Sequence, residues 1–157
     1  MIAGLSISGL RAGYGEAEVL HDVSWSVRAG ALTVLTGPNG AGKTTLLSAI
    51  TGSVEVTSGS IHLGGEALER SSMHARRQAG VAYVPEARDL FPNLTVWENL
   101  RVASRAWEIP RAEVADRIVN ALESFPQLDE KLHTPVTLLS GGQQQLVCIA
   151  RALLTDP

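Results

Sequence analysis

The segment with the clearest chemistry is Gly37–Thr44, which reads G-P-N-G-A-G-K-T. Its three glycines allow the backbone to turn successive N–H groups toward an anion, and the positive end of a following helix adds to that field. Lys43 supplies a mobile positive charge for β and γ phosphates, and the Thr44 hydroxyl is a candidate ligand for Mg²⁺. An ordinary glycine-rich turn before a helix would not need this full spacing. The segment therefore predicts a loop that binds a nucleoside triphosphate.

A second glycine-rich segment, Leu139–Gln143 (L-S-G-G-Q), lies downstream of this phosphate loop. Ser140 and Gln143 have the spacing of a capping box, so the segment could simply begin a helix. The N–H groups at such a helix start can also bind an anion. The motif alone supports both interpretations equally, and its place after a phosphate loop favours the anion-binding one.

Composition describes an ordinary globular chain of 157 residues, with 45% hydrophobic and 18% charged residues. A net charge of -3 offers no overall electrostatic reason for a nucleic acid partner. No apolar stretch is long enough to span a bilayer. The single cysteine, Cys148, fits a reducing cytoplasm and is expected to be a small buried hydrophobe. Arg76 and Arg77 are expected on a solvated face.

Alternating or short apolar runs predict five strands. They are Ile2–Leu10, Val19–Val27, Leu32–Thr36, Gly59–Gly65 and Gly80–Val84. The third leads directly into the phosphate loop, which then sits between a strand and a helix that Gly52 ends. This order predicts a mixed α/β domain with a parallel core around the phosphate loop.

The rest of the chain is expected to be mostly helical. Thr95 and Glu98 form a capping box that opens a helix to about Trp107, Pro110 begins another, and a last helix opens near Ser140. Glu113 and Arg117 should pair on a wet face. The side chains expected to face inward are Val114, Ile118, Val119, Leu122 and Phe125 in one helix, and Leu146, Ile149, Ala150 and Leu153 in the last.

These segments, in this order, resemble the nucleotide-binding domain of an ABC transporter. The resemblance implies an α/β fold, with a P-loop nucleoside triphosphate hydrolase-like core, an N-terminal antiparallel β subdomain and a helical insert. The β subdomain and Walker A core would occupy residues 1–87. The helical subdomain, with a lead-in equivalent to the Q-loop, would occupy 88–140, and the signature motif and its helix 139–157. The domain would be incomplete.

The resemblance assigns roles to individual residues. The Walker A loop matches Gly37, Pro38, Asn39, Gly40, Ala41, Gly42, Lys43, Thr44 and Thr45. The signature matches Leu139, Ser140, Gly141, Gly142 and Gln143, which in the family contact the γ phosphate of a nucleotide held by the opposite subunit. Tyr14 matches the aromatic residue that stacks on adenine, with a strand-edge tyrosine as the alternative.

Glu86 stands where many members of the family have a glutamine. The surrounding V-P-E-A-R-D-L-F-P-N-L-T-V-W-E-N-L is similar to a segment of the ATP-binding subunits of importers for branched-chain amino acids, urea and short amides. Glu86 is therefore expected, with Thr44, to contact the metal or its water. The alternative is a surface glutamate in a loop.

The family's catalytic carboxylates, an Asp-Glu pair after an apolar strand, would follow Pro157, and a switch histidine would come later. No catalytic residue is therefore assigned within the chain, and hydrolysis by these residues alone is doubtful. The strand carrying that pair would pair with Leu32–Thr36. Without it, the sheet should have an unpaired edge and exposed apolar surface.

The resemblance implies an ABC-type ATPase subunit that binds ATP and Mg²⁺ and closes a dimer to energise uptake of branched-chain amino acids or related solutes. Its partners would be a second ATP-binding subunit, identical or not, transmembrane permease subunits and, indirectly, a periplasmic or extracellular solute-binding protein. It would sit peripherally on the cytoplasmic face of the membrane. The alternative is a truncated remnant that binds nucleotide or a partner without hydrolysis. A soluble ABC ATPase is disfavoured because tandem cassettes are absent, and a P-loop kinase is disfavoured by the signature.

Overall fold

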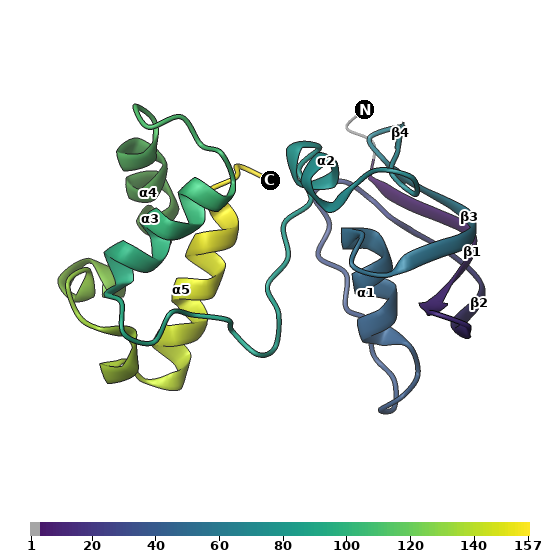
Figure 1. The fold of residues 1–157 in the computed structure, drawn as a ribbon, viewed down its shortest axis with the longest axis horizontal. Coiled ribbons are helices and arrows are strands. Elements are labelled where there is room, and N and C mark those ends of the chain that lie inside the picture. The colour runs from purple at the N-terminus through teal and green to yellow at the C-terminus, as the bar shows by residue number, and fades with distance from the viewer. Residues whose placement is uncertain (1–3) are drawn as a thin grey trace. The chain divides into compact units, whose positions relative to one another are not determined.

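The computed structural model describes residues 4–157 of the chain. They form two compact units, the first ending at Ala79 and the second running from Gly80 to Pro157 (Figure 1). The finer division into β subdomain, helical subdomain and signature segment stays a prediction.

The first unit contains a four-stranded antiparallel sheet in the order β2-β1-β3-β4. Its strands are β1 (Leu5–Tyr14), β2 (Ala17–Val27), β3 (Glu55–Leu63) and β4 (Glu66–Ala67). The strand predicted at Val19–Val27 is confirmed and begins earlier, at Ala17. The strand predicted at Gly59–Gly65 is confirmed as far as Leu63 and begins earlier, at Glu55, while Gly64 and Gly65 form a turn. The first predicted strand is confirmed from Leu5 onward, while Ile2 and Ala3 lie outside the described residues.

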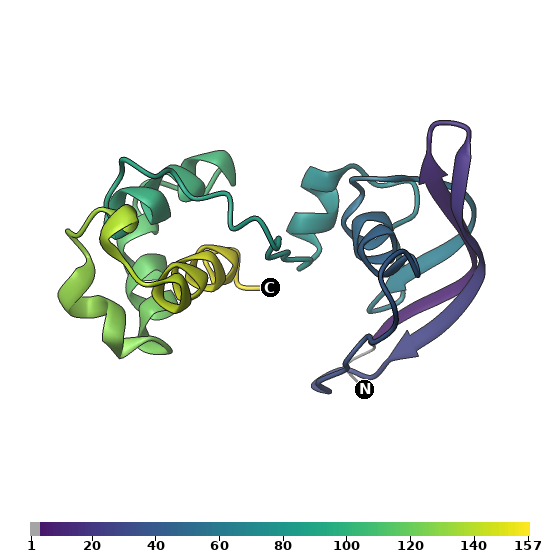
Figure 2. The same cartoon turned by 90° about the horizontal axis from the view of Figure 1, so that it is seen from below.

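Helix α1 (Lys43–Thr51) lies over one face of this sheet (Figure 2). Alternation along the strands turns Leu10, Leu20 and Ile61 inward, where each is at most 4% exposed. Leu46 and Ile50 of α1 are buried as well. Apolar burial of this kind contributes roughly 25 cal/mol per Å² of surface removed from water, so the sheet and α1 stabilise each other.

The prediction that Arg76 lies on a solvated face is wrong. Arg76 belongs to α2 (Met73–Gln78) and is only 3% exposed. Its Nη1 donates to the carbonyl oxygens of Ala49 and Ile50 at the end of α1, the latter at 2.9 Å. Its Nε donates to Ser71 O at 2.9 Å, and its Nη2 to Glu69 O at 3.1 Å. The last carbonyls of a helix lack intrahelical donors, and a guanidinium satisfies them and the negative end of the dipole together.

The chain leaves α1 through Gly52, as the sequence predicted. Gly52 has a φ of 83°, and its N–H donates to the carbonyls of Ala49 and Ser48. A Cβ at this position would lie 3.0 Å from Nε of Arg76. Glu69 precedes α2. The backbone amides of Glu69 itself and of Ile61 donate to its carboxylate and hold the pKa of Glu69 below its ordinary value.

The strands predicted at Leu32–Thr36 and Gly80–Val84 are not formed. Strand formation needs a neighbouring strand that accepts and donates backbone hydrogen bonds, and the described sheet offers these two segments none. Leu32 and Val34 are 95% and 74% exposed, so the expected exposed apolar surface is present. The parallel core expected around the phosphate loop is accordingly absent from the described sheet, which is antiparallel throughout.

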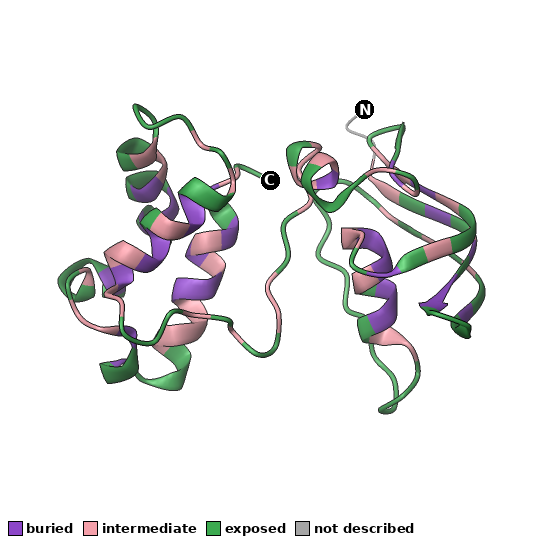
Figure 3. Ribbon diagram, viewed as in Figure 1, coloured by how far each residue is buried: buried purple, intermediate pink, exposed green. Residues whose placement is uncertain are grey.

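The second unit is helical. Its elements are α3 (Val96–Ala106), α4 (Val114–Glu123), the short 3₁₀ helices η1 (Pro126–Lys131) and η2 (Val136–Leu138), and α5 (Gly141–Leu153). The buried positions of α3, α4 and α5 face one another (Figure 3). This core includes Val96, Leu100, Ile118, Leu122, Leu128, Val147 and Leu154. Cys148 is 5% exposed, as predicted.

Three details of these helices differ from expectation. Helix α4 begins at Val114 rather than Pro110, because the intervening residues form a turn closed by Glu113 N and Pro110 O. Val119 is 56% exposed and Leu153 is 36% exposed. Both lie one residue away from the stripe that packs inward, which in α4 is formed by Ile118, Ala121 and Leu122.

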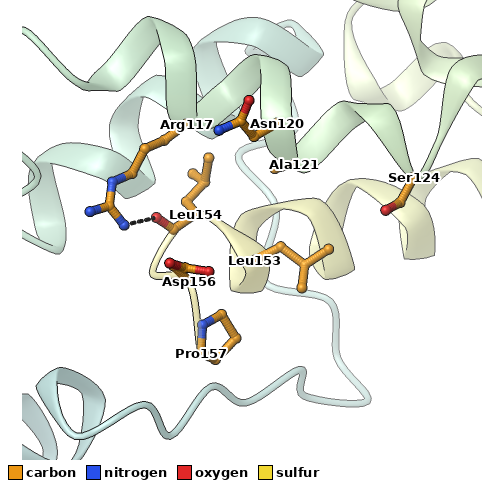
Figure 4. A pocket seen from close by; sticks show the side chains of 8 residues that line it. All are labelled: Arg117, Asn120, Ala121, Ser124, Leu153, Leu154, Asp156 and Pro157. Atoms are coloured by element: carbon orange, nitrogen blue, oxygen red, sulfur yellow. Dashed lines mark hydrogen bonds between the residues drawn. The ribbon is translucent and has the colours of Figure 1, made fainter.

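The predicted pair of Glu113 and Arg117 is confirmed at 3.2 Å. Arg117 also reaches the end of α5, where its Nη1 donates to Leu154 O at 3.3 Å beside an open hollow of about 490 Å³ (Figure 4). The arginine thus ties the start of α4 to the end of α5.

The capping box at the start of α3 should make the folding stability of the second unit depend on pH. Hydrogen bonds from the backbone amide and then the hydroxyl of Thr95, both 2.9 Å, hold the pKa of Glu98 below its ordinary value. A lowered folded-state pKa adds stability above the unfolded pKa, and this is lost as pH falls through the folded-state value. In Glu98→Gln an uncharged amide can still form the capping box. We expect this variant to be less stable than the parent at neutral pH.

That difference should shrink as the pH falls from the ordinary range of a glutamate carboxyl through the lowered folded-state pKa of Glu98, because the parent carboxylate is then protonated. Urea midpoints of the parent and Glu98→Gln across this range provide the measurement. Glu123→Gln, on exposed surface, is the matched control. A gap between parent and Glu98→Gln that is constant with pH would contradict the expectation.

Candidate nucleotide-binding site

The phosphate loop ends in an uncapped helix start. Gly37, Gly40 and Gly42 have φ values of 154°, 80° and 86°. Gly42 occupies the N-cap position of α1, where no side chain accepts from the first turn and no acidic residue follows. The first N–H groups of a helix have no intrahelical acceptor, so this end of α1 offers donors and a positive dipole end to an anion.

Lys43 folds back over this loop. Its Nζ donates to the carbonyl oxygens of Gly37 at 2.9 Å and Pro38 at 2.7 Å. An ammonium has three donors, so a third remains for a ligand. The loop itself is tightened by a hydrogen bond from Ala41 N to Pro38 O at 3.3 Å. The ammonium charge is therefore held at the mouth of the loop.

The loop is positioned against β2. A Cβ added to Gly42 would lie 2.9 Å from Cδ2 of Leu20 and 3.8 Å from Cγ1 of Val19. Together with its φ of 86°, this close approach restricts the position to glycine. Thr44 is exposed and available to a ligand, whereas Thr45 is 7% exposed and packs under the loop. The remaining predicted loop residue, Asn39, is also exposed.

Tyr14 ends β1 at the hairpin and is 55% exposed. It pairs with Ala17 across the turn, and the hairpin is braced by Glu18, which binds Arg11 at 2.7 Å and His21 at 2.6 Å through the same oxygen. An exposed ring on a braced hairpin of the same unit as the phosphate loop suits a stacking role.

The second predicted anion site is the start of α5. Ser140 Oγ accepts from Gln143 N at 3.3 Å, and Gln143 Oε1 accepts from Ser140 N at 3.0 Å, which forms the expected capping box. This box uses two of the orphan amides and leaves those of Gly141 and Gly142 at an exposed first turn. Leu139 is 6% exposed and anchors the motif to the core. Both interpretations of the motif, cap and anion site, are therefore physically compatible.

Glu86 is exposed in the second unit. Among residues 4–157, no group of three or more His, Cys, Asp or Glu side chains is arranged to hold a metal ion.

Two residues, Asn99 and Arg88, were not predicted from the sequence to have a role. Asn99 is fully buried, accepts from Phe91 N at 2.9 Å and donates to the carbonyls of Phe91, Leu94 and Thr95. It fixes the loop that leads into α3. An amide inside the apolar stripe of a helix was the available signal, because buried polar groups must be satisfied.

A family model described as ABC transporter matches residues 20–157, well over half of the chain. The chain belongs to the ABC transporter family. A solved structure of the ATP-binding subunit of an ABC transporter matches this family member with a TM-score of 0.79 and 35% identity, over 99% of the chain and 63% of that structure. The expected α/β fold class is thereby confirmed.

Two curated relatives are ATP-binding proteins of different transport systems, one for branched-chain amino acids and one for Nod factor export. The probable branched-chain amino acid transport ATP-binding protein LivF of Archaeoglobus fulgidus is 41% identical over 145 residues, which are 92% of this ABC transporter chain and 61% of the relative. The Nod factor export ATP-binding protein I of Ralstonia nicotianae is 41% identical over 153 residues, which are 98% of the chain and 47% of the relative. The predicted resemblance to branched-chain amino acid transport ATPases is confirmed. The chain spans less than two thirds of either relative. Among its described residues, no helix is long and apolar enough to cross a bilayer.

Proposed function

We propose that this chain is the ATP-binding part of an ABC importer for branched-chain amino acids or related small solutes, in which Mg·ATP joins two subunits and ATP hydrolysis drives transport. The observation that carries the proposal is the start of α1, where exposed backbone donors, a positive dipole end and Nζ of Lys43 converge. Such a cluster matches the charge of a polyphosphate.

In this proposal one copy holds the nucleotide through Gly37–Thr45. Amides of the loop bind phosphate oxygens, and Lys43 turns its remaining donor to the β and γ phosphates. Mg²⁺ would neutralise phosphate charge when bound, with the exposed hydroxyl of Thr44 and the carboxylate of Glu86 as candidate contacts. Tyr14 stacks on the adenine.

The signature of a second copy closes the site. The free amides of Gly141 and Gly142, at the positive end of α5, suit the γ phosphate, while Leu139, Ser140 and Gln143 fix the turn that presents them. Since each copy carries both surfaces, two copies would enclose two nucleotides.

The importer assignment rests on the similarity to LivF and on the segment around Glu86. Its partners would be a second ATP-binding subunit, permease subunits in the membrane and, indirectly, a solute-binding protein outside it. The location would be the cytoplasmic face of the membrane.

The shared site can be tested by complementation between two defective copies. Lys43→Ala damages the phosphate loop, and Gly142→Asp places a carboxylate where the γ phosphate would bind. Neither variant alone should associate in Mg·ATP. An equimolar mixture should form dimers, because a mixed pair retains one intact site. Sedimentation velocity with and without Mg·ATP measures the association.

Gly142→Ala serves as the steric control, since a Cβ at this position meets nothing within 4 Å. A mixture that stays monomeric while the parent dimerises would rule out a nucleotide shared between copies. A parent that binds ATP but never associates would instead favour a binding-only protein.

A further inference from the structure

The segment Arg88–Phe91 is attached to one side of α5. Arg88 and Asp89 are consecutive non-glycine residues with positive φ values of 62° and 47°. Their carbonyls are held by α5, since Cys148 Sγ donates to Arg88 O at 3.2 Å and Arg151 Nη1 donates to Asp89 O at 2.6 Å. The Arg151 guanidinium also lies 6.0 Å from the centre of the Phe91 ring.

The side chain of Arg88 continues this attachment toward the signature. Its Nη1 donates to Oε1 of Gln144 at 3.0 Å. Gln144, Cys148 and Arg151 are spaced by four and three residues, so they form one stripe along α5. Burial raises the pKa of the Cys148 thiol, which keeps it protonated as a donor. The segment is thus bound along a continuous polar face.

Gln144 also donates hydrogen bonds to the turn before the signature. Its Nε2 donates to Val136 O at 3.0 Å and to Leu139 O at 3.3 Å. The same turn is held from the other side, because Val136 N donates to Leu94 O at 3.1 Å. Gln144 therefore uses both ends of its amide, one for Arg88 and one for the backbone that carries Leu139 and Ser140.

The side chain of Arg88 also lies close to Gly141 of the signature. A Cβ added to Gly141 would lie 3.3 Å from Nη2 of Arg88, a contact closer than ordinary packing. A cation gains nothing from the positive end of a helix dipole, so the dipole does not account for this position. The hydrogen bond to Gln144 and the fixed backbone of Arg88 and Asp89 do account for it.

We propose that Arg88 is a positioning residue for the signature, acting through Gln144 to fix the turn that presents Gly141 and Gly142. The inference rests on the proposed function in so far as those amides bind the γ phosphate of a nucleotide held by another copy. The planar guanidinium can bond Gln144 while lying flat beside Gly141, and a lysine ammonium cannot do both.

The test measures Mg·ATP-dependent association of the 157-residue chain. We expect Arg88→Ala to weaken association on the order of tenfold, the effect of losing one hydrogen bond to a charged group. Arg88→Lys should recover only part of this loss. Arg111→Ala, on exposed surface of the same unit, is the matched control. ATP affinity of the monomer should be unchanged, because Arg88 is not among the residues proposed to contact the bound nucleotide.

A double-mutant cycle separates positioning from general destabilisation. If Arg88 acts through Gln144, Arg88→Ala should cause little further loss in a Gln144→Ala background. Equal losses in both backgrounds, or an Arg88→Ala variant that associates like Arg111→Ala, would overturn the proposal.

Hydrogen exchange without nucleotide gives a second readout that does not depend on association. The amides of Leu139, Ser140 and Gln143, which donate hydrogen bonds at the signature in the parent, should exchange faster in Arg88→Ala than in Arg111→Ala, while those of α4 stay unchanged. If the parent fails to associate in Mg·ATP, the proposed shared site is wrong, and exchange alone decides the role of Arg88. Unchanged exchange at the signature would then refute it.

Discussion

Replacing Lys43 with alanine should abolish the stabilisation of this chain by ATP. For the parent, ATP at a hundred times its dissociation constant should add about 2.7 kcal/mol to the free energy of unfolding. Lys43 is the cation at the mouth of the phosphate loop, and its Nζ already lies within hydrogen-bonding distance of two loop carbonyls. Without it, the backbone donors alone face the charge of the phosphates.

Thermal unfolding with and without Mg·ATP measures this effect. The relevant quantity is the shift caused by ATP, since Lys43→Ala also removes two hydrogen bonds from the empty loop and lowers the starting stability. Lys131→Ala, in η1 of the second unit, controls for loss of a lysine. An ATP-dependent shift as large in Lys43→Ala as in the parent would refute the phosphate-loop assignment.

Replacing Arg76 with methionine should destabilise the first unit by about 3 kcal/mol or more. Methionine keeps most of the apolar stem but removes every donor. The carbonyls of Ala49 and Ile50 then lose the donor that satisfies them in a buried place. Burial lowers the pKa of Arg76, and the hydrogen bonds of its guanidinium to backbone carbonyls offset the cost of removing this charge from water.

Hydrogen exchange read by mass spectrometry locates this loss. Peptides from α1 and β3 should exchange faster in Arg76→Met, whereas peptides from α3 to α5 act as an internal reference. Arg70→Met, an exposed arginine in the same unit, is the matched control. Equal protection of α1 in the two variants would mean that the guanidinium contributes little to stability.

Local signals were enough to predict the elements that carry the candidate site. Glycine at position 52 ends α1 because its left-handed conformation is intrinsic to the residue, and Thr95 and Ser140 begin helices through bonds to residues only three positions away. Such contacts depend on spacing alone. The glycine-rich loop and the two helix starts were therefore readable in advance.

Tertiary contacts were not readable in the same way. Leu32–Thr36 has the composition of a strand, but a strand also requires a partner, and composition cannot supply one. The neighbouring arginines Arg76 and Arg77 look like a solvated pair, yet one of them meets the end of a helix more than twenty residues away in the chain. Long-range partners of this kind leave no periodic trace.

The stripe on α5 lies between these two cases. Gln144, Cys148 and Arg151 recur at helical spacing along α5, so a polar stripe beside the apolar face could be read from the sequence. The partners of this stripe could not be predicted, because Arg88 and Asp89 both adopt a positive-φ backbone conformation that non-glycine residues rarely adopt.

Arg76 also has a consequence for the ligand. The negative pole of α1 is permanently compensated by a buried guanidinium, while its positive pole opens on the phosphate loop with no acidic side chain to neutralise it. The helix dipole is thus neutralised at its negative end only. A bound polyphosphate would neutralise the positive end. Because Arg76 already compensates the negative end, the potential at the phosphate loop is more positive and favours anion binding more strongly.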